Sequence, residues 1–134
     1  MEKTLTDGTK LLMKMADGIT LKRGDIVSFS LNINDKEASV MKRIIALPNE
    51  TIHINGSEVY INDQLLDEPY AYYSETSELN LTLTINEGGY FVMGDNRNNS
   101  MDSRDPQVGS IKRKDLIGRA WVRVYPFHTF GVLN

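Results

Sequence analysis

The sequence predicts a single all-β domain. Apolar and polar residues alternate along most of the chain, a pattern typical of strands with one buried face. Val, Ile and Tyr are frequent in these alternating runs, and Gly, Asn, Asp and Pro interrupt them. No stretch longer than about ten residues has the 3.6-residue period of a helix. The length of 134 residues suits one domain with its own core.

Turn residues divide the chain into its expected strands. Asn55-Gly56 lies between two apolar runs and predicts a tight hairpin turn, because both residues tolerate positive φ. Asn62-Asp63 is a further candidate turn, and Pro48-Asn49 and Glu87-Gly88-Gly89 are breaks. One short helical turn fits within 107–115. The expected strands are residues 10–15, 25–31, 39–46, 51–54, 57–61, 80–85, 89–93 and 116–125.

Composition excludes several classes of function. The 15 basic and 18 acidic side chains give a net charge of −3, which argues against a nucleic-acid-binding surface. The absence of cysteine excludes disulfides, thiol catalysis and cysteine-ligated metals. His53 and His128 have neither the neighbours of a catalytic triad nor the spacing of metal ligands. No apolar stretch approaches the roughly 18–20 residues that cross a bilayer.

Two segments carry possible chemistry. Residues 94–104, GDNRNNSMDSR, follow an apolar strand and contain almost no apolar side chain. Such a loop can satisfy its backbone through short side-chain hydrogen bonds and ion pairs, although a solvated turn has the same composition. Alternation in 40–44 places Lys42 on one strand face with Val40 and Ile44. A lysine there either snorkels to solvent or becomes a base, because burial lowers its pKa.

These segments resemble the type I signal peptidases, in a short form like that of Gram-positive bacteria. Residues 94–104 resemble the family signature GDNRxNSxDSR, and residues 41–50, MKRIIALPNE, are similar to its KRxxGLPGD box. Residues 22–27 and 1–5 match two smaller pieces, and all four occur in the family's order. The resemblance extends from residue 1 to about residue 126.

The resemblance implies a fold and an activity. The expected fold has antiparallel sheets that form a catalytic core, residues 1–54 and 89–134, with a small β cap insertion at 55–88. The expected activity is that of a membrane-anchored serine endopeptidase with a Ser/Lys dyad, which removes signal peptides from exported preproteins. Its domain would lie on the extracytoplasmic side against the membrane surface, and it would use no cofactor, metal or nucleic acid.

Site residues follow from the same resemblance. Lys42 matches the general base, and Ser100 matches the hydroxyl that orients it, which we expect to donate to the neutral amine. Asp102 and Arg104 match a structural ion pair beside the site. Further support is expected from Asp95, Arg97 and Arg43. Substrate pockets are expected from Met1, Leu5, Leu11, Val40 and Met41.

The chain departs from the family pattern at several positions. The nucleophilic serine would precede Met1 by one position and is absent from the sequence, which predicts an inactive fragment without its membrane anchor. Lys3 replaces a proline, Ala46 replaces a glycine, and Asn49-Glu50 replaces Gly-Asp. Of these, Asn49 can still adopt the positive φ that a glycine would.

Two other functions compete with the peptidase interpretation. Self-cleaving repressors share the Ser/Lys chemistry, but this chain has neither a helix-turn-helix pattern nor a basic charge. A non-catalytic signal-peptidase homologue that binds pilins as an assembly factor is the stronger alternative. Retention of both Lys42 and Ser100 favours the peptidase, because a purely structural homologue has no reason to keep them. The residue encoded before Met1 distinguishes the two.

Overall fold

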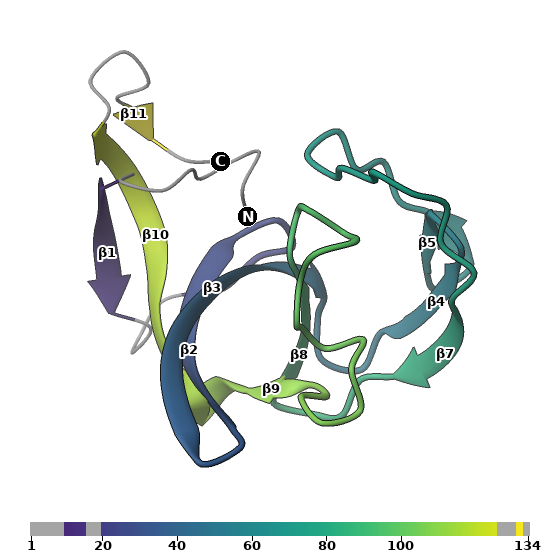
Figure 1. Ribbon diagram of the computed structural model, residues 1–134, viewed down its shortest axis with the longest axis horizontal. Helices are drawn as coiled ribbons and strands as arrows, with labels where there is room; N and C mark the ends of the chain where they lie inside the picture. The colour runs from purple at the N-terminus through teal and green to yellow at the C-terminus, as the bar shows by residue number, and fades with distance from the viewer. Residues whose placement is uncertain (1–9, 16–19, 126–130, 133–134) are drawn as a thin grey trace.

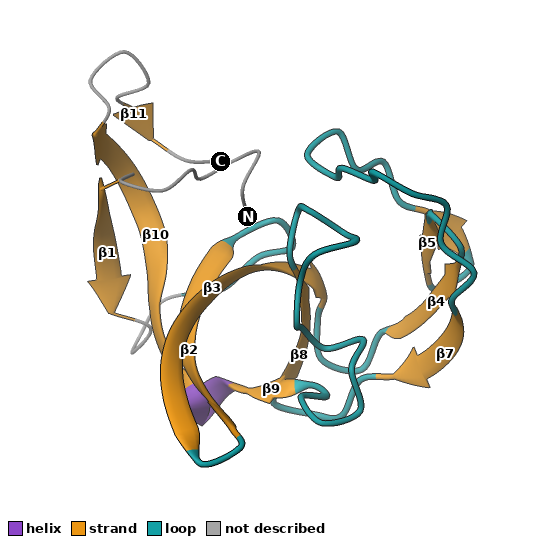
Figure 2. Cartoon of the chain, in the orientation of Figure 1, coloured by secondary structure: helices purple, strands orange, loops and turns teal. Residues whose placement is uncertain are grey.

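A computed structural model of the protein describes residues 10–15, 20–125 and 131–132, with side chains from 20 to 120. It confirms the all-β prediction, because the described elements are antiparallel strands and one 3₁₀ turn (Figure 2). These elements are β1 (Lys10–Met15), β2 (Ile26–Ile33), β3 (Lys36–Ala46), β4 (Thr51–Asn55), β5 (Glu58–Ile61), β6 (Gln64–Leu65), β7 (Asn80–Thr84), β8 (Gly89–Met93), β9 (Ile111–Lys112), η1 (Arg113–Asp115), β10 (Leu116–Tyr125) and β11 (Gly131–Val132).

The strands form two sheets (Figure 1). The larger, seven-stranded sheet has the order β1-β10-β2-β3-β8-β9, with β11 paired to β10. Its strands β2, β3, β8 and β9 curve round an interior, and the small sheet stands beside them on the far side from β1 and β10 (Figure 1). The small sheet has four strands in the order β6-β5-β4-β7.

Several strand boundaries agree with the sequence prediction. Strands β1, β8 and β10 have the predicted bounds. Strands β2 and β3 extend further than predicted, because Asn34 and Asp35 adopt φ of 54° and 61° and form a tight hairpin turn between them. Strands β6, β9 and β11 were not predicted, since two residues are too short to show alternation.

Two hydrophobic clusters lie on opposite faces of β3 and β8. Ile44 and Val92 belong to the first cluster, within the curved part of the large sheet, whereas Ile45 and Met93 belong to the second. The second cluster also contains the buried residues of β4 and β5, so it fills the space between the two sheets. Neighbouring residues separate in this way because successive side chains of a strand point to opposite faces.

The start of β4 is tied to the segment before β2. The Glu50 carboxylate accepts hydrogen bonds from Arg23 Nη1 at 2.6 Å and Nη2 at 2.7 Å, and from the Leu47 amide at 2.6 Å. Asn49 adopts a φ of 69°, the conformation expected where the family pattern has glycine. The Arg23–Glu50 ion pair thus connects the first residue before β4 of the small sheet to the segment that leads into β2 of the large sheet.

Candidate active site

Strand β3 supplies the lysine of the site. Lys42 pairs with Val27 of β2 and is half-buried. Its neighbours on the same strand face, Val40 and Ile44, both pack in the first hydrophobic cluster. Lys42 therefore leaves β3 on the same face as two apolar side chains, as the alternation predicted.

Lys42 and Ser100 meet across the loop formed by residues 94–104. Lys42 Nζ lies 2.9 Å from Ser100 Oγ, which confirms the predicted contact between the two groups. Gly94 lies directly beside this contact: a methyl group on its Cα would be 2.6 Å from Ser100 Cβ and 3.5 Å from Lys42 Nζ. Only a glycine leaves room for both side chains at this point of the loop.

The hydrogen bond between these two residues runs in the opposite direction from that predicted. Ser100 Oγ donates to Asp102 Oδ2 at 2.7 Å, and it accepts from Lys42 Nζ. A hydroxyl has one proton, and the ionised carboxylate of Asp102 can only accept, so it takes that proton. Ser100 consequently presents its oxygen, and not its proton, to the lysine.

Asp102 is the centre of this arrangement. Its side chain is fully buried and binds Arg104 through Nε and Nη2, both at 2.8 Å, which confirms the predicted ion pair. It also accepts from the Gly94 amide at 2.9 Å. Burial alone would raise the pKa of Asp102, but the hydrogen bonds and charge of Arg104, with the bonds from Gly94 and Ser100, lower it below its usual value. Asp102 therefore stays ionised at neutral pH.

The surroundings of Lys42 lower its pKa. Burial lowers the pKa of Lys42 below the ordinary lysine value. The negative charge of Asp102 opposes this shift, and the positive charge of Arg104 adds to it. Because Asp102 is itself paired with Arg104, its carboxylate does not cancel the effect of burial on the lysine.

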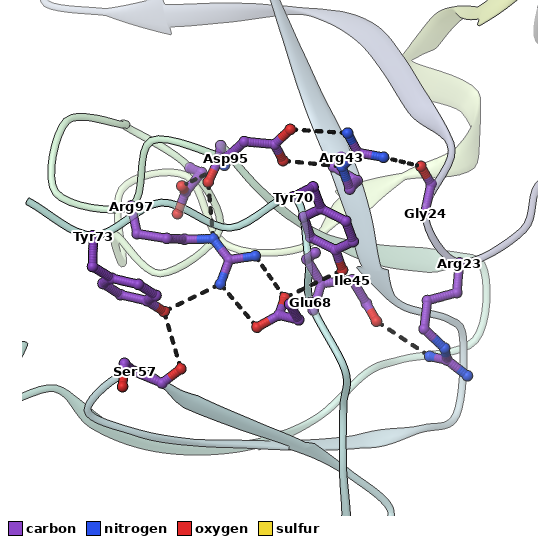
Figure 3. A network of polar contacts seen from close by, with 12 residues as sticks. Arg23, Gly24, Arg43, Ile45, Ser57, Glu68, Tyr70, Tyr73, Asp95 and Arg97 are labelled. Atoms are coloured by element: carbon purple, nitrogen blue, oxygen red, sulfur yellow. Dashed lines mark hydrogen bonds and ion pairs between the residues drawn. The ribbon is translucent and has the colours of Figure 1, made fainter. Parts of the chain in front are cut away.

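A second ion pair joins the two segments behind the site. Arg43 Nε and Nη2 each lie 2.9 Å from an oxygen of Asp95, and both side chains are buried (Figure 3). Arg43 Nη1 also donates to the Gly24 carbonyl at 2.9 Å. Since Arg43 follows Lys42 and Asp95 follows Gly94, this pair clamps the lysine strand to the beginning of the loop.

The third predicted support residue, Arg97, has partners that sequence reasoning did not identify. Arg97 Nε donates to the Gly94 carbonyl at 3.0 Å, and Nη1 and Nη2 bind Glu68 at 3.0 and 2.6 Å (Figure 3). Tyr70 places its ring 4.2 Å from the guanidinium carbon of Arg43. Glu68 and Tyr70 lie in a segment that carries none of the recognised motifs, so no sequence signal pointed to them.

The remaining predicted positions have mixed outcomes. Val40 and Met41 are half-buried on β3, and Leu11 lies in β1, whose side chains are outside the described part. Met1 and Leu5 lie outside the described residues altogether. Strand β3 pairs with β2 along one edge and with β8 along the other, but β8 pairs with it only from Arg43 onward. The part of β3 before Arg43 therefore has no strand partner on the β8 side among the described residues.

In the described part of the chain, the site contains neither a histidine nor a group of side chains that could bind a metal ion. His53 Nδ1 lies 2.7 Å from Thr82 Oγ1 on the exposed face of the small sheet, and His128 lies outside the described residues. Within the described ranges, no three His, Asp or Glu side chains are grouped so that they could hold a metal ion. The same ranges contain no helix long and apolar enough to cross a membrane.

Replacing Gly94 by alanine tests the close packing of the site. The new methyl group would overlap Ser100, and we expect destabilisation of about 1–3 kcal/mol, as for other overpacked sites, with loss of the Lys42–Ser100 contact. Urea unfolding measures the first effect. Gly88→Ala is the control, because its added methyl group meets nothing within 4 Å and only its φ of 75° is strained. Equal stability of Gly94→Ala and the unmodified chain would contradict the described packing.

Comparison with known proteins identifies the family of the chain. The family model for signal peptidase, peptidase S26, matches residues 1–125. Signal peptidase I U of Bacillus subtilis is 40% identical over 95% of this chain and 72% of its own length. Signal peptidase I of Bacillus amyloliquefaciens is 35% identical over 96% of this chain and 70% of its own.

A solved structure supports the same assignment. The crystal structure of a signal peptidase I from Enterococcus faecalis matches with a TM-score of 0.62 and 32% identity, over 75% of this chain and 97% of that one. The fold and the sequence therefore point to the same family. The chain belongs to the signal peptidase family, peptidase S26. The members of this family are named for their action on signal peptides.

Proposed function

We propose that this chain is the catalytic domain of a serine endopeptidase that removes signal peptides from exported preproteins with a Ser/Lys dyad. The observation that carries the proposal is the contact of Lys42 Nζ with Ser100 Oγ at 2.9 Å, on a partly apolar strand face. Lys42 is the general base. The nucleophile is a serine in the position before Met1, where the family pattern has it.

The hydrogen bonds of the site suit a neutral lysine. One N–H of Lys42 points to Ser100, because the Ser100 proton is taken by Asp102. The amine then keeps its lone pair for the proton of the nucleophilic hydroxyl. The serine oxygen bonds to the scissile carbonyl carbon, the peptide C–N bond breaks, and Lys42 passes the proton to the leaving amine. Water, deprotonated by Lys42, then bonds to the ester carbonyl carbon, the ester bond to the serine oxygen breaks, and Lys42 returns the proton to that oxygen.

The substrate would lie along β3. The edge of β3 before Arg43 can pair with an extended peptide, since β8 does not cover it there. Val40 and Met41, half-buried on this stretch, would line shallow pockets for small side chains, together with Met1, Leu5 and Leu11. In this proposal residues 55–88 are the cap, residues 1–54 and 89–134 are the catalytic core, and Asp95, Arg97, Asp102, Arg104 and Arg43 support the site.

The natural protein would be anchored in the cell membrane, with this domain on the extracytoplasmic side. Its partners would be the signal peptides of preproteins and the membrane surface that presents them. The reaction proposed here needs no cofactor and no metal, because a lysine of lowered pKa performs the proton transfers.

The pH dependence of cleavage tests the role of Lys42. In a parent protein with the serine and its upstream membrane segment, the single-turnover rate should rise with pH as the ammonium loses its proton. The apparent pKa should lie well below the value of about 10.4 for an exposed lysine, because burial lowers it. A rate that is independent of pH, or that rises only near 10.4, would contradict a buried lysine base.

A further inference from the structure

Two residues of the expected cap insertion, Glu68 and Tyr70, contact the arginines that support the site, Arg97 and Arg43. We propose that residues 68–73, here called the strap, position the Lys42–Ser100 pair, with Glu68 and Tyr70 as its positioning residues. The inference rests on the proposed function of Lys42 as the base. It adds to that function two residues that lie outside the recognised motifs and touch neither Lys42 nor Ser100 in the described contacts.

The strap is joined to the 94–104 loop by main-chain hydrogen bonds. The Tyr72 amide donates to the Asp95 carbonyl at 2.7 Å, and the Arg97 amide donates to the Tyr72 carbonyl at 2.8 Å. These bonds form a short parallel bridge between Tyr72 and Asn96, outside both sheets. The bridge adds the strap as a strand-like partner to the loop that carries Ser100.

Side chains strengthen this junction. The Glu68 carboxylate binds both terminal nitrogens of Arg97, and the two side chains are almost fully buried, with exposed fractions of 7% and 0%. The Tyr70 ring covers Arg43, and its hydroxyl donates to Glu68 at 3.3 Å. Figure 3 shows Glu68 directed at Arg97 and the Tyr70 ring beside Arg43.

The junction reaches the site through Gly94. Arg97, held by Glu68, donates to the Gly94 carbonyl at 3.0 Å, and the Gly94 amide donates to Asp102. Gly94 in turn packs against Ser100, within reach of Lys42. Since one guanidinium bonds to both the strap and the loop, releasing Glu68 would loosen the loop that holds Ser100 against Lys42.

The test is a titration of Lys42 in the chain of 134 residues. A titration can be carried out without the nucleophilic serine, because it does not depend on cleavage. The pKa of Lys42 is determined by NMR titration of its labelled Cε signal, assigned by its loss in Lys42→Ala. In Glu68→Gln we expect the pKa of Lys42 to rise by about one unit toward the ordinary lysine value, as water enters the loosened site. Tyr70→Leu, which removes the ring over Arg43, should raise it in the same direction.

The charges near Lys42 make this readout specific. Those that act on it are Asp102, Arg104 and Asp95, and β2 presents only Val27 opposite it. Glu68 is not among them. Loss of the negative charge of Glu68 cannot by itself raise the pKa of Lys42, because removing an anion disfavours the ammonium form. A rise in the pKa therefore reports movement of the loop.

The chain offers a matched control. Tyr60 donates to Glu58 at 3.2 Å with the same two-residue spacing as Tyr70 and Glu68, but this pair is exposed on the small sheet. Glu58→Gln and Tyr60→Leu should leave the pKa of Lys42 where it is in the unmodified chain. Equal shifts in control and strap variants would overturn the proposal, since they would show a general loosening of the cap.

The outcomes separate this inference from the proposed function. If Lys42 titrates like an exposed lysine in the unmodified chain, the general-base role fails. If its pKa is lowered there but does not move in Glu68→Gln or Tyr70→Leu, the base stands and the strap proposal fails.

Amide hydrogen exchange covers the case in which these variants do not fold. In the unmodified chain the amides of Tyr72, Arg97 and Gly94 should exchange in one common opening. Exchange of Tyr72 and Arg97 while Gly94 stays protected would overturn the proposal.

Discussion

Lys42→Ala is expected to lower the single-turnover cleavage rate of the serine-bearing parent protein by about a thousandfold or more. General base catalysis contributes about 10²–10⁴-fold, and no other described side chain touches Ser100 in a way that could replace the amine. The loss should appear in the chemical step, with binding of a signal peptide largely retained, because the peptide would contact the edge of β3 and the pockets.

Two companion variants sharpen this test. Lys42→Arg should be as inactive as Lys42→Ala, since a guanidinium stays protonated at every usable pH. Lys36→Ala removes an exposed lysine at the start of the same strand, and should cleave at the unmodified rate. Substantial activity in Lys42→Ala would exclude the Ser/Lys mechanism. An unmodified parent that cleaves no preprotein would instead favour the assembly-factor alternative.

Asp102→Ala should give a large loss of stability, because the Asp102 side chain is fully buried and ion-paired. It leaves the Arg104 guanidinium and the Gly94 amide without their buried acceptor. Breaking a buried pair on one side costs roughly 3–5 kcal/mol, and that loss should be visible in urea or thermal unfolding of the printed chain. The effect on stability requires no catalytic activity.

The pH dependence of this loss has a definite sign. The pKa of Asp102 in the folded chain is below its ordinary value, so its contribution is complete above the unfolded value of about 3.9. It is lost as the pH falls through the lower, folded pKa. The difference between Asp102→Ala and the unmodified chain should therefore narrow only in strong acid.

Asp25→Ala is the matched control for this stability measurement. Asp25 also pairs with an arginine, but its oxygen lies 3.7 Å from Arg119 Nη1, and both side chains are about one-fifth exposed. A pair of this kind contributes at most about 1 kcal/mol. If Asp102→Ala lowered the free energy of unfolding no more than Asp25→Ala, the buried Asp102–Arg104 pair would not contribute to stability as predicted.

Much of the fold could be predicted from alternation and turn residues. Strand β8 has its predicted bounds because the apolar run ends abruptly at a polar loop, and β10 because its alternation is long. The hairpin at Asn34 and Asp35 could also have been predicted, since both residues tolerate positive φ. The two-residue strands β6 and β9 could not, because their pairing is decided by neighbours distant in sequence.

The site was predictable only in part, and for a different reason. Lys42 could be recognised as unusual from its strand face, but its meeting with Ser100 came from family resemblance, since 58 residues separate them. The direction of their hydrogen bond depends on the position of Asp102 relative to the hydroxyl, which sequence spacing does not specify. Glu68 was missed because a bidentate partner for Arg97 could lie anywhere along the chain.

The two hydrophobic clusters hold the strand that carries Lys42 in place before a substrate binds. Strands β3 and β8 form a wall shared by both clusters, with Ile44 packed on one side and Ile45 on the other. Close-packed interiors resist displacement, so the backbone of this wall cannot shift without disturbing both clusters. The strand that carries the proposed base is thus preorganised before a substrate arrives. A substrate peptide would then meet a base that is already in place, as electrostatic preorganisation of an active site requires.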